Sequence, residues 1–270
     1  MSTNQKGHLF FVDIFAPGTS EGKTLTSQAI RDYCRAAGIE PTVVRFESAA
    51  AAGTHPDGEV FINSEKLIDA EPNSGGPISI LDPISEAITA GASKGTPVIL
   101  DWAGGQSALR GDFYVASAFD SIVAERGFVG WSFVVTTNQA ASMVEAGNAL
   151  NETAKVAPRL RRVLVLNHRD GGFDRFPSGS AAAKAYADTL MPQASRCAAQ
   201  LTLPLIARHG WEPFAAAGLG FLEVLSRPVN ELADITGLSP LLAATCRSSV
   251  AAWWAEVRAQ LERILLSNNG

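Results

Sequence analysis

A segment near the start of the chain has the residue types that bind phosphate groups. Pro17 to Thr24 read PGTSEGKT, directly after the apolar run Leu9–Phe15 and before a helix-like pattern that ends at Gly38. Between a strand and a helix, successive backbone N–H groups and the positive end of the helix dipole form an anion site. Lys23 would reach the β- and γ-phosphates of a nucleotide, and the Thr24 hydroxyl would coordinate Mg²⁺. The predicted phosphate-binding residues are Gly18, Thr19, Ser20, Glu21, Gly22, Lys23 and Thr24.

This segment departs once from the phosphate-loop pattern G-x-x-x-x-G-K-[ST]. Pro17 stands where the pattern has glycine, and proline has no N–H and a φ fixed at about −65°. The donors that would hold a phosphate lie mainly in Ser20–Thr24, so Pro17 changes the loop geometry more than its hydrogen bonds. The alternative interpretation is a surface turn that happens to contain Gly-Lys-Thr.

An acid and two glycines follow another apolar segment. Asp101 ends the predicted strand Thr96–Asp101, and Gly104 and Gly105 come shortly after it. Asp101 would hold the water shell of a Mg²⁺ ion near Thr24. The two glycines would let backbone N–H groups approach the γ-phosphate. The alternative for Asp101 is a helix or turn cap.

Two further strand ends carry candidate site residues. Glu47 follows PTVVRF, where it could order the attacking water or the water around Mg²⁺, or be a solvated loop acid. Asn167 ends RRVLVLN, where it could pair with adenine or simply turn the chain. Asp13 lies inside the first strand, and a buried carboxylate there needs a partner that the sequence does not identify.

Apolar strands alternate with helices along the chain. This order predicts an α/β fold with a mainly parallel twisted sheet covered by helices on both faces. Ligands bind beyond the carboxyl ends of such strands, where the candidate residues fall. We expect one domain over residues 1–270, with C-terminal helices of about 212–270 packed on it. Strands are expected at Leu9–Phe15, Pro41–Phe46, Val60–Ile62, Thr96–Asp101, Val129–Thr137, Arg161–Asn167 and Leu203–Ala207, and helices include 107–125, 139–155 and 181–200.

Composition narrows the class of protein. With 270 residues, 46% of them apolar, the chain is long enough to bury a core. A net charge of −5 provides no global attraction to nucleic acid or anionic lipid. The three cysteines are widely spaced and lack zinc-ligand spacing. No apolar run reaches the roughly 18 residues of a spanning helix, so we expect a cytoplasmic protein with no membrane association.

The order of these motifs resembles that of the ParA/MinD-like P-loop ATPases, and among them the StbB-type plasmid-stability and conjugative-transfer proteins. The resemblance covers most of residues 9–207. FAPGTSEGKT is similar to their phosphate loop, RFES to the strand-end Glu-Ser after their first helix, and LDWAGG to their Walker B strand and switch glycines. FVVTTNQAAS and VLVLNHRD are similar to the strands that follow, the second ending in a base-recognising Asn.

The resemblance implies a P-loop NTPase that uses ATP and Mg²⁺, with Lys23, Asp101 and Glu47 as catalytic residues and Thr24 and Asp101 at the metal. It implies slow hydrolysis coupled to a nucleotide-dependent homodimer that partitions or positions cargo. A plasmid-encoded protein or non-specific DNA is the implied partner. The family's signature lysine falls on Gly18, however, and a transition-state cation from a partner chain accelerates related NTPases by roughly 10³–10⁵. We therefore expect very slow turnover unless another Arg or Lys substitutes.

Two other function classes remain open. A dethiobiotin-synthetase-like ATP-dependent ligase has the same fold and a similar loop. Such a ligase needs a second lysine after the first helix, where this chain has only Arg45 as a cation. A non-hydrolysing nucleotide-binding module would use the loop without turnover. Stimulation of ATP hydrolysis by DNA or a partner, dependence on a diamine substrate, or binding without phosphate release distinguishes the three.

Overall fold

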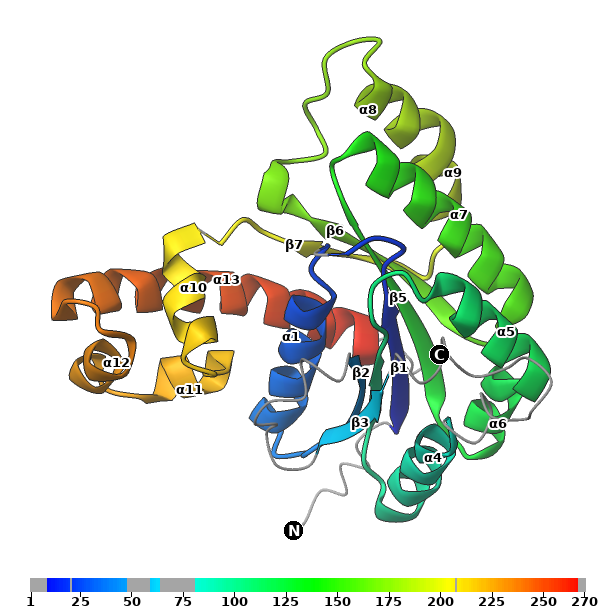
Figure 1. Cartoon of the computed structure of the whole chain (residues 1–270), viewed down its shortest axis with the longest axis horizontal. Helices are drawn as coiled ribbons and strands as arrows, with labels where there is room; N and C mark the ends of the chain where they lie inside the picture. The colour runs from blue at the N-terminus through cyan, green and yellow to red at the C-terminus, as the bar shows by residue number, and fades with distance from the viewer. Residues whose placement is uncertain (1–8, 20, 48–58, 64–80, 207, 267–270) are drawn as a thin grey trace.

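The computed structural model describes residues 9–19, 21–47, 59–63, 81–206 and 208–266. Among these residues the centre is a seven-stranded sheet in the order β3-β2-β4-β1-β5-β6-β7, and each neighbouring pair is parallel (Figure 1). The predicted parallel sheet is therefore confirmed. Its strands are β1 (Phe10–Phe15), β2 (Thr42–Glu47), β3 (Glu59–Asn63), β4 (Val98–Asp101), β5 (Val129–Thr137), β6 (Arg161–Asn167) and β7 (Ala199–Leu203).

Helices cover both faces of the sheet, as the alternation of strands and helices predicts (Figure 1). They are α1 (Lys23–Ala36), α4 (Asp82–Lys94), α5 (Ser107–Ser117), α6 (Phe119–Glu125), α7 (Ala140–Val156), α8 (Ala181–Lys184), α9 (Met191–Ala194), α10 (Arg208–Ala216), α11 (Phe221–Ser226), α12 (Val229–Thr236) and α13 (Pro240–Leu266). Successive side chains of a strand point to opposite faces. Val12 and Ile14 of β1 therefore pack with α1 and α13, whereas Phe11 and Phe15 pack with α4 to α7.

The single helix predicted over residues 107–125 is wrong, because the chain forms two helices there. Ala118, between α5 and α6, has a φ of 48° in the left-handed region, which ends one helix and starts the next. The break turns Phe119 into the core, where its ring lies edge-on to Phe11 and Tyr114 at centroid distances of 5.7 Å. Burial of this ring offsets the strain at Ala118, which costs about 1–2 kcal/mol.

The last strand begins earlier than predicted. β7 covers Ala199–Leu203 rather than 203–207, and the helical segment expected to reach residue 200 ends at Ala194. Residues 199–203 pair in register with residues 163–167 of β6. Pro204 has no N–H to continue the ladder, which explains why the strand stops before it.

The C-terminal helices share a hydrophobic core with β1 and α1. α13 packs on β7 and α1, and α10, α11 and α12 gather around its first half (Figure 1). Trp253 and Trp254 of α13 are buried and stack on Phe221 of α11 at centroid distances of 4.7 and 5.7 Å. The helical C-terminal segment is thus confirmed, whereas the single-domain organisation stays a prediction. Within the described part of the chain, every helix is too short or too polar to cross a lipid bilayer.

Candidate functional site

The loop between β1 and α1 ends in a left-handed glycine. Gly22 has a φ of 104° and a ψ of 18°, and α1 begins at the next residue. A Cβ at Gly22 would lie 2.3 Å from Asn167 Nδ2, so neither the backbone nor the space admits a side chain. Thr26 N donates the first helical hydrogen bond to Gly22 O at 2.9 Å. The earlier N–H groups of α1 have no intrahelical acceptor and form the positive end of its dipole.

Lys23 lies buried over this loop. Its Nζ donates a hydrogen bond to Gly18 O at 2.8 Å, and the residue is 8% exposed. Burial lowers the pKa of Lys23, whereas the carboxylates of Asp101 and Glu21 raise it. An ammonium group held by backbone in a partly dehydrated site is placed to bind an anion at the start of α1.

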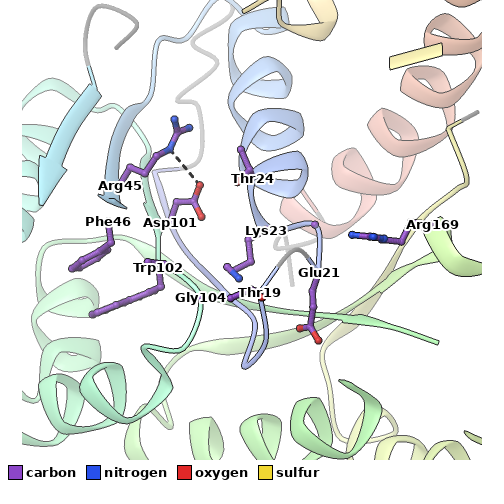
Figure 2. Close-up of a pocket in the computed structure, with 12 residues that line it drawn as sticks. Thr19, Glu21, Lys23, Thr24, Arg45, Phe46, Asp101, Trp102, Gly104 and Arg169 are labelled. Atoms are coloured by element: carbon purple, nitrogen blue, oxygen red, sulfur yellow. Dashed lines mark ion pairs between the residues drawn. The ribbon is translucent and has the colours of Figure 1, made fainter. Parts of the chain in front are cut away.

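Glu21 folds back over the same loop. A Cβ at Gly18 would lie 2.8 Å from Glu21 Oε1, so any side chain at position 18 has to displace this carboxylate. Burial raises the pKa of Glu21, and a hydrogen bond with Ser142 and the charge of Lys23 oppose that shift. Figure 2 shows the Glu21 carboxylate pointing away from Lys23, so the two side chains occupy different sides of the loop.

Asn167 supports the loop from β6. Its Nδ2 donates to Glu21 O at 2.8 Å, and its Oδ1 accepts from Arg169 N at 3.1 Å. The residue is 3% exposed, and it lies where Gly22 leaves room for it. Asn167 therefore fixes the backbone of the predicted phosphate loop, and its role in reading adenine stays a prediction.

Asp101 faces the loop from the neighbouring strand. It is in register with Ile14 of β1, and Trp102 N donates to Ile14 O at 3.1 Å. Burial raises the pKa of Asp101 to about 6, while the charges of Arg45 and Lys23 and the nearby polar side chain of Ser27 act in the opposite direction. The ionised carboxylate therefore lacks full compensation among the described residues, and a bound cation would supply it.

Arg45 is a site residue that the sequence reasoning missed. In the pairing of β2 with β4 it lies directly opposite Asp101, and its Nε is 3.5 Å from Asp101 Oδ2. Its Nη1 is also 3.0 Å from Glu59 Oε2 in β3. The available signal was the alternation of β2, which places Arg45 on the face opposite Val44 and Phe46. The local sequence pattern does not show which strand pairs with β2, so it could not show that Arg45 lies opposite Asp101.

These residues surround a cavity of about 420 Å³ at the carboxyl end of the sheet (Figure 2). It brings together most of the predicted site residues, and Arg45 and Arg169 add cations. The predicted Ser20 and the Glu47 side chain lie outside the described part of the chain, and Gly18, Gly105 and Asn167 do not line this cavity. The lining residues are Thr19, Glu21, Gly22, Lys23, Thr24, Arg45, Phe46, Asp101, Trp102, Ala103, Gly104 and Arg169.

A second cavity of about 510 Å³ adjoins the first, because Gly22, Thr24 and Arg169 line both. Apolar side chains form much of its wall. Asn167 lines this second cavity at the end of β6. Its other lining residues are Leu25, Gln28, Asp170, Pro204, Leu205, Ile206, Trp211, Glu212 and Ala215.

The loop after β4 is in close contact with the phosphate loop. A Cβ at Gly104 would lie 2.7 Å from Thr19 Cγ2, so a side chain at this position would force Thr19 to shift. Trp102 is buried beside it and stacks on Phe46 at a centroid distance of 4.2 Å. Gly104 and Thr19 are therefore packed so closely that a shift of one requires a shift of the other.

No protein-family model and no curated protein sequence matches the chain. Solved structures similar to it include a ParA family ATPase from Chlorobium tepidum (13% identity, TM-score 0.46), which covers 93% of this chain and 99% of its own. An ATP complex of a Cyanothece McdA variant has 12% identity and a TM-score of 0.42, with 86% and 98% covered. The Aquifex aeolicus cell-division protein MinD has 11% identity and a TM-score of 0.36, with 93% and 96% covered.

The residues that line the cavity fit a nucleoside triphosphate with Mg²⁺. Mg²⁺ in phosphate-transfer sites takes one or two protein oxygens and completes its shell with phosphate and water. Thr24 and Asp101 line the cavity and provide a hydroxyl and a carboxylate, and Asp101 Oδ2 has no hydrogen-bond partner among the described residues. Lys23 and the N-terminus of α1 provide the positive charge that the phosphates need.

Proposed function

We propose that this chain is a ParA-like nucleotide-switch ATPase that binds ATP with Mg²⁺ between β1, β4 and the start of α1. One observation carries the proposal: Lys23 and Asp101, both buried, line the same cavity, Lys23 from the start of α1 and Asp101 from the end of β4. A buried lysine at the start of a helix, such as Lys23, is placed to bind an anion. A buried acid beside it with a raised pKa, such as Asp101, is placed to bind a cation.

The two adjoining cavities suit the two ends of a nucleotide. The cavity lined by Lys23 and Thr24 would hold the phosphates, and the more apolar one lined by Trp211 and Asn167 would hold the base and ribose. Gly22, Thr24 and Arg169 line both, so one ligand can extend from one cavity into the other. The backbone around Gly22 would then lie against the phosphates nearest the sugar.

Each protein group has a separate role in this proposal. Lys23 would bind the outer phosphates, and Thr24 and Asp101 would hold the metal ion, Asp101 through water. Bound Mg²⁺ would neutralise the charge that develops on the phosphates. Glu47 would order the attacking water. Because Gly18 has no side chain at the family's lysine position, we propose slow hydrolysis.

The switch in this proposal is the loop that contains Gly104. Gly104 lies against Thr19 of the phosphate loop, so the presence or loss of a terminal phosphate would move it. α5 follows this loop directly and would transmit the change to a second copy of the chain. We propose that the nucleotide-dependent homodimer formed in this way positions plasmid, DNA or other cargo, with a partner protein or non-specific DNA.

Nucleotide affinity tests the proposal most directly. Calorimetry with ATP and Mg²⁺ on the wild type, Lys23→Ala and Lys94→Ala compares a cavity lysine with an exposed lysine on α4. We expect Lys23→Ala to weaken ATP binding at least tenfold, or about 1.4 kcal/mol, and Lys94→Ala to leave it unchanged. Equal affinity in all three proteins would overturn the site.

Turnover distinguishes the function classes. Phosphate release stimulated by DNA, together with ATP-dependent dimers in light scattering, would support the switch ATPase. ATP use that requires a diamine and carbonate would instead indicate a ligase similar to dethiobiotin synthetase. ATP binding with no phosphate release, unchanged in Asp101→Ala, would indicate a non-hydrolysing module.

A further inference from the structure

A cluster of five charged side chains lies beside the phosphate cavity. Arg31 of α1 and Arg45 of β2 both form ion pairs with Glu59, and Arg45 also pairs with Asp101. Lys23 acts on Asp101 from the other side, as its effect on the Asp101 pKa shows. Arg45 and Lys23 thus place two cations beside Asp101, and both line the phosphate cavity. Two cations that line one cavity favour the binding of an anion there.

Arg45 and Arg31 differ in their relation to the cavity. Both pair with Glu59, but only Arg45 lines the cavity that contains Lys23. Arg45 lies opposite Asp101 in the ladder, in a strand that pairs with β3 on one side and β4 on the other, so its backbone is fixed. Figure 2 shows Asp101 between the Arg45 guanidinium and the Lys23 ammonium group.

One contact of the Arg45 guanidinium, the ion pair with Asp101, is long. Its distance of 3.5 Å to Asp101 exceeds the roughly 2.7–2.9 Å of a charge-assisted hydrogen bond. If the guanidinium leaves these partners, Glu59 keeps the ion pair with Arg31, and Asp101 keeps the attraction of the Lys23 charge. Neither carboxylate would be left buried without a partner, which is the costly outcome.

We propose that Arg45 binds the terminal phosphate of a nucleoside triphosphate and makes this chain discriminate ATP from ADP without a cation from a partner. The proposal rests on the nucleotide site proposed above. The guanidinium moves from Asp101 to the phosphate oxygens, which its planar geometry can contact in pairs. Asp101 is then available to the water shell of the metal ion. A diphosphate lacks the terminal phosphate oxygens that Arg45 would bind, so Arg45 adds little to the affinity for ADP.

The ratio of ATP affinity to ADP affinity tests this role. Calorimetry in Mg²⁺ compares the wild type with Arg45→Ala, and Arg31→Ala serves as the matched control because it also removes a cation from Glu59. We expect Arg45→Ala to weaken ATP binding by about tenfold while ADP binding changes by less than about twofold. Arg31→Ala should leave the ratio unchanged. Arg45→Gln, which keeps a polar side chain without the charge, provides the same comparison if the alanine variant does not fold.

The outcomes separate this inference from the proposed function. If the wild type fails to bind ATP, or Lys23→Ala binds it equally well, the nucleotide site itself is wrong. If Lys23→Ala loses ATP but Arg45→Ala and Arg45→Gln keep the wild-type ratio, only the role of Arg45 is wrong. An equal fall in the ratio of ATP affinity to ADP affinity for Arg31→Ala would also overturn this role. The effect would then come from disruption of the ion pairs around Glu59 and not from contact between Arg45 and the phosphate.

Discussion

Arg110 of α5 donates hydrogen bonds from Nε and Nη2 to the carboxylate of Asp13 in the middle of β1, and both side chains are buried. Trp102 Nε1 and Ser132 Oγ donate to the same carboxylate at 2.7 and 2.9 Å. Thr153 Oγ1 accepts from Arg110 Nη1 at 3.2 Å. The network ties α5 and the residue after Asp101 to the central strand, directly below the candidate site. It provides the partner that a carboxylate inside β1 requires.

Loss of Arg110 should destabilise the fold strongly. In Arg110→Met the Asp13 carboxylate stays buried without its cation, and we expect the free energy of unfolding to fall by about 3–5 kcal/mol. Urea denaturation would measure this, with Arg126→Met as a control because Arg126 is exposed. The double variant Asp13→Leu/Arg110→Met should recover part of the loss. Additive losses would show that the two residues are not coupled.

Removal of the Asp101 charge should stabilise the fold above pH 6. The pKa of about 6 in the folded chain exceeds the ordinary 3.8. This carboxyl therefore favours folding below pH 4, and the contribution is lost as the pH rises through 6. Asp101→Asn does not titrate, so its unfolding free energy should exceed that of the wild type by up to about 3 kcal/mol at pH 8. Urea titrations at pH 4 and pH 8 measure the difference, and an equal gain at both would contradict it.

The left-handed conformation of Gly22 should make it intolerant of a side chain. Gly38 also has a positive φ, of 75°, but a Cβ there meets no atom within 4 Å. We expect Gly38→Ala to destabilise by about 1–2 kcal/mol from backbone strain alone. Gly22→Ala should lose more and also weaken ATP binding, because its Cβ collides with Asn167. In an Asn167→Ala background the additional loss on adding Gly22→Ala should shrink towards the Gly38 value, and an unchanged loss would refute the steric explanation.

Asp32 should hold the C-terminal helices to α1. Its Oδ2 accepts from Phe221 N at 2.7 Å and from Leu222 N at 3.3 Å, and the residue is buried. Asp32→Ala leaves these N–H groups without an acceptor and should destabilise by about 1–3 kcal/mol. Asp32→Asn keeps an acceptor oxygen and should lose less. Hydrogen exchange at the Phe221 and Leu222 amides would report the effect, and unchanged protection in Asp32→Ala would contradict it.

Local patterns in the chain were enough to place the main strands and the phosphate loop. The bounds of β5 and β6 match the predicted residues 129–137 and 161–167 because each strand contains a run of apolar β-forming residues, 133–135 and 163–166, that is followed by polar residues. The order strand, Gly-Lys-Thr, helix placed Lys23 and Thr24 at the start of α1. Parallel strands have their carboxyl ends at one edge, so Asp101 could be predicted to lie near Lys23.

The order of the strands in the sheet could be determined only from the three-dimensional structure. β4 lies between β1 and β2, which sets Arg45 opposite Asp101, and α5 packs over β1, which brings Arg110 to Asp13. These contacts join residues more than fifty positions apart, and no local periodicity encodes them. Ala118 likewise adopts its left-handed conformation because Phe119 gains burial in a core that forms from distant segments. The chain's local chemistry thus specifies the phosphate loop, while long-range packing determines which charges surround it.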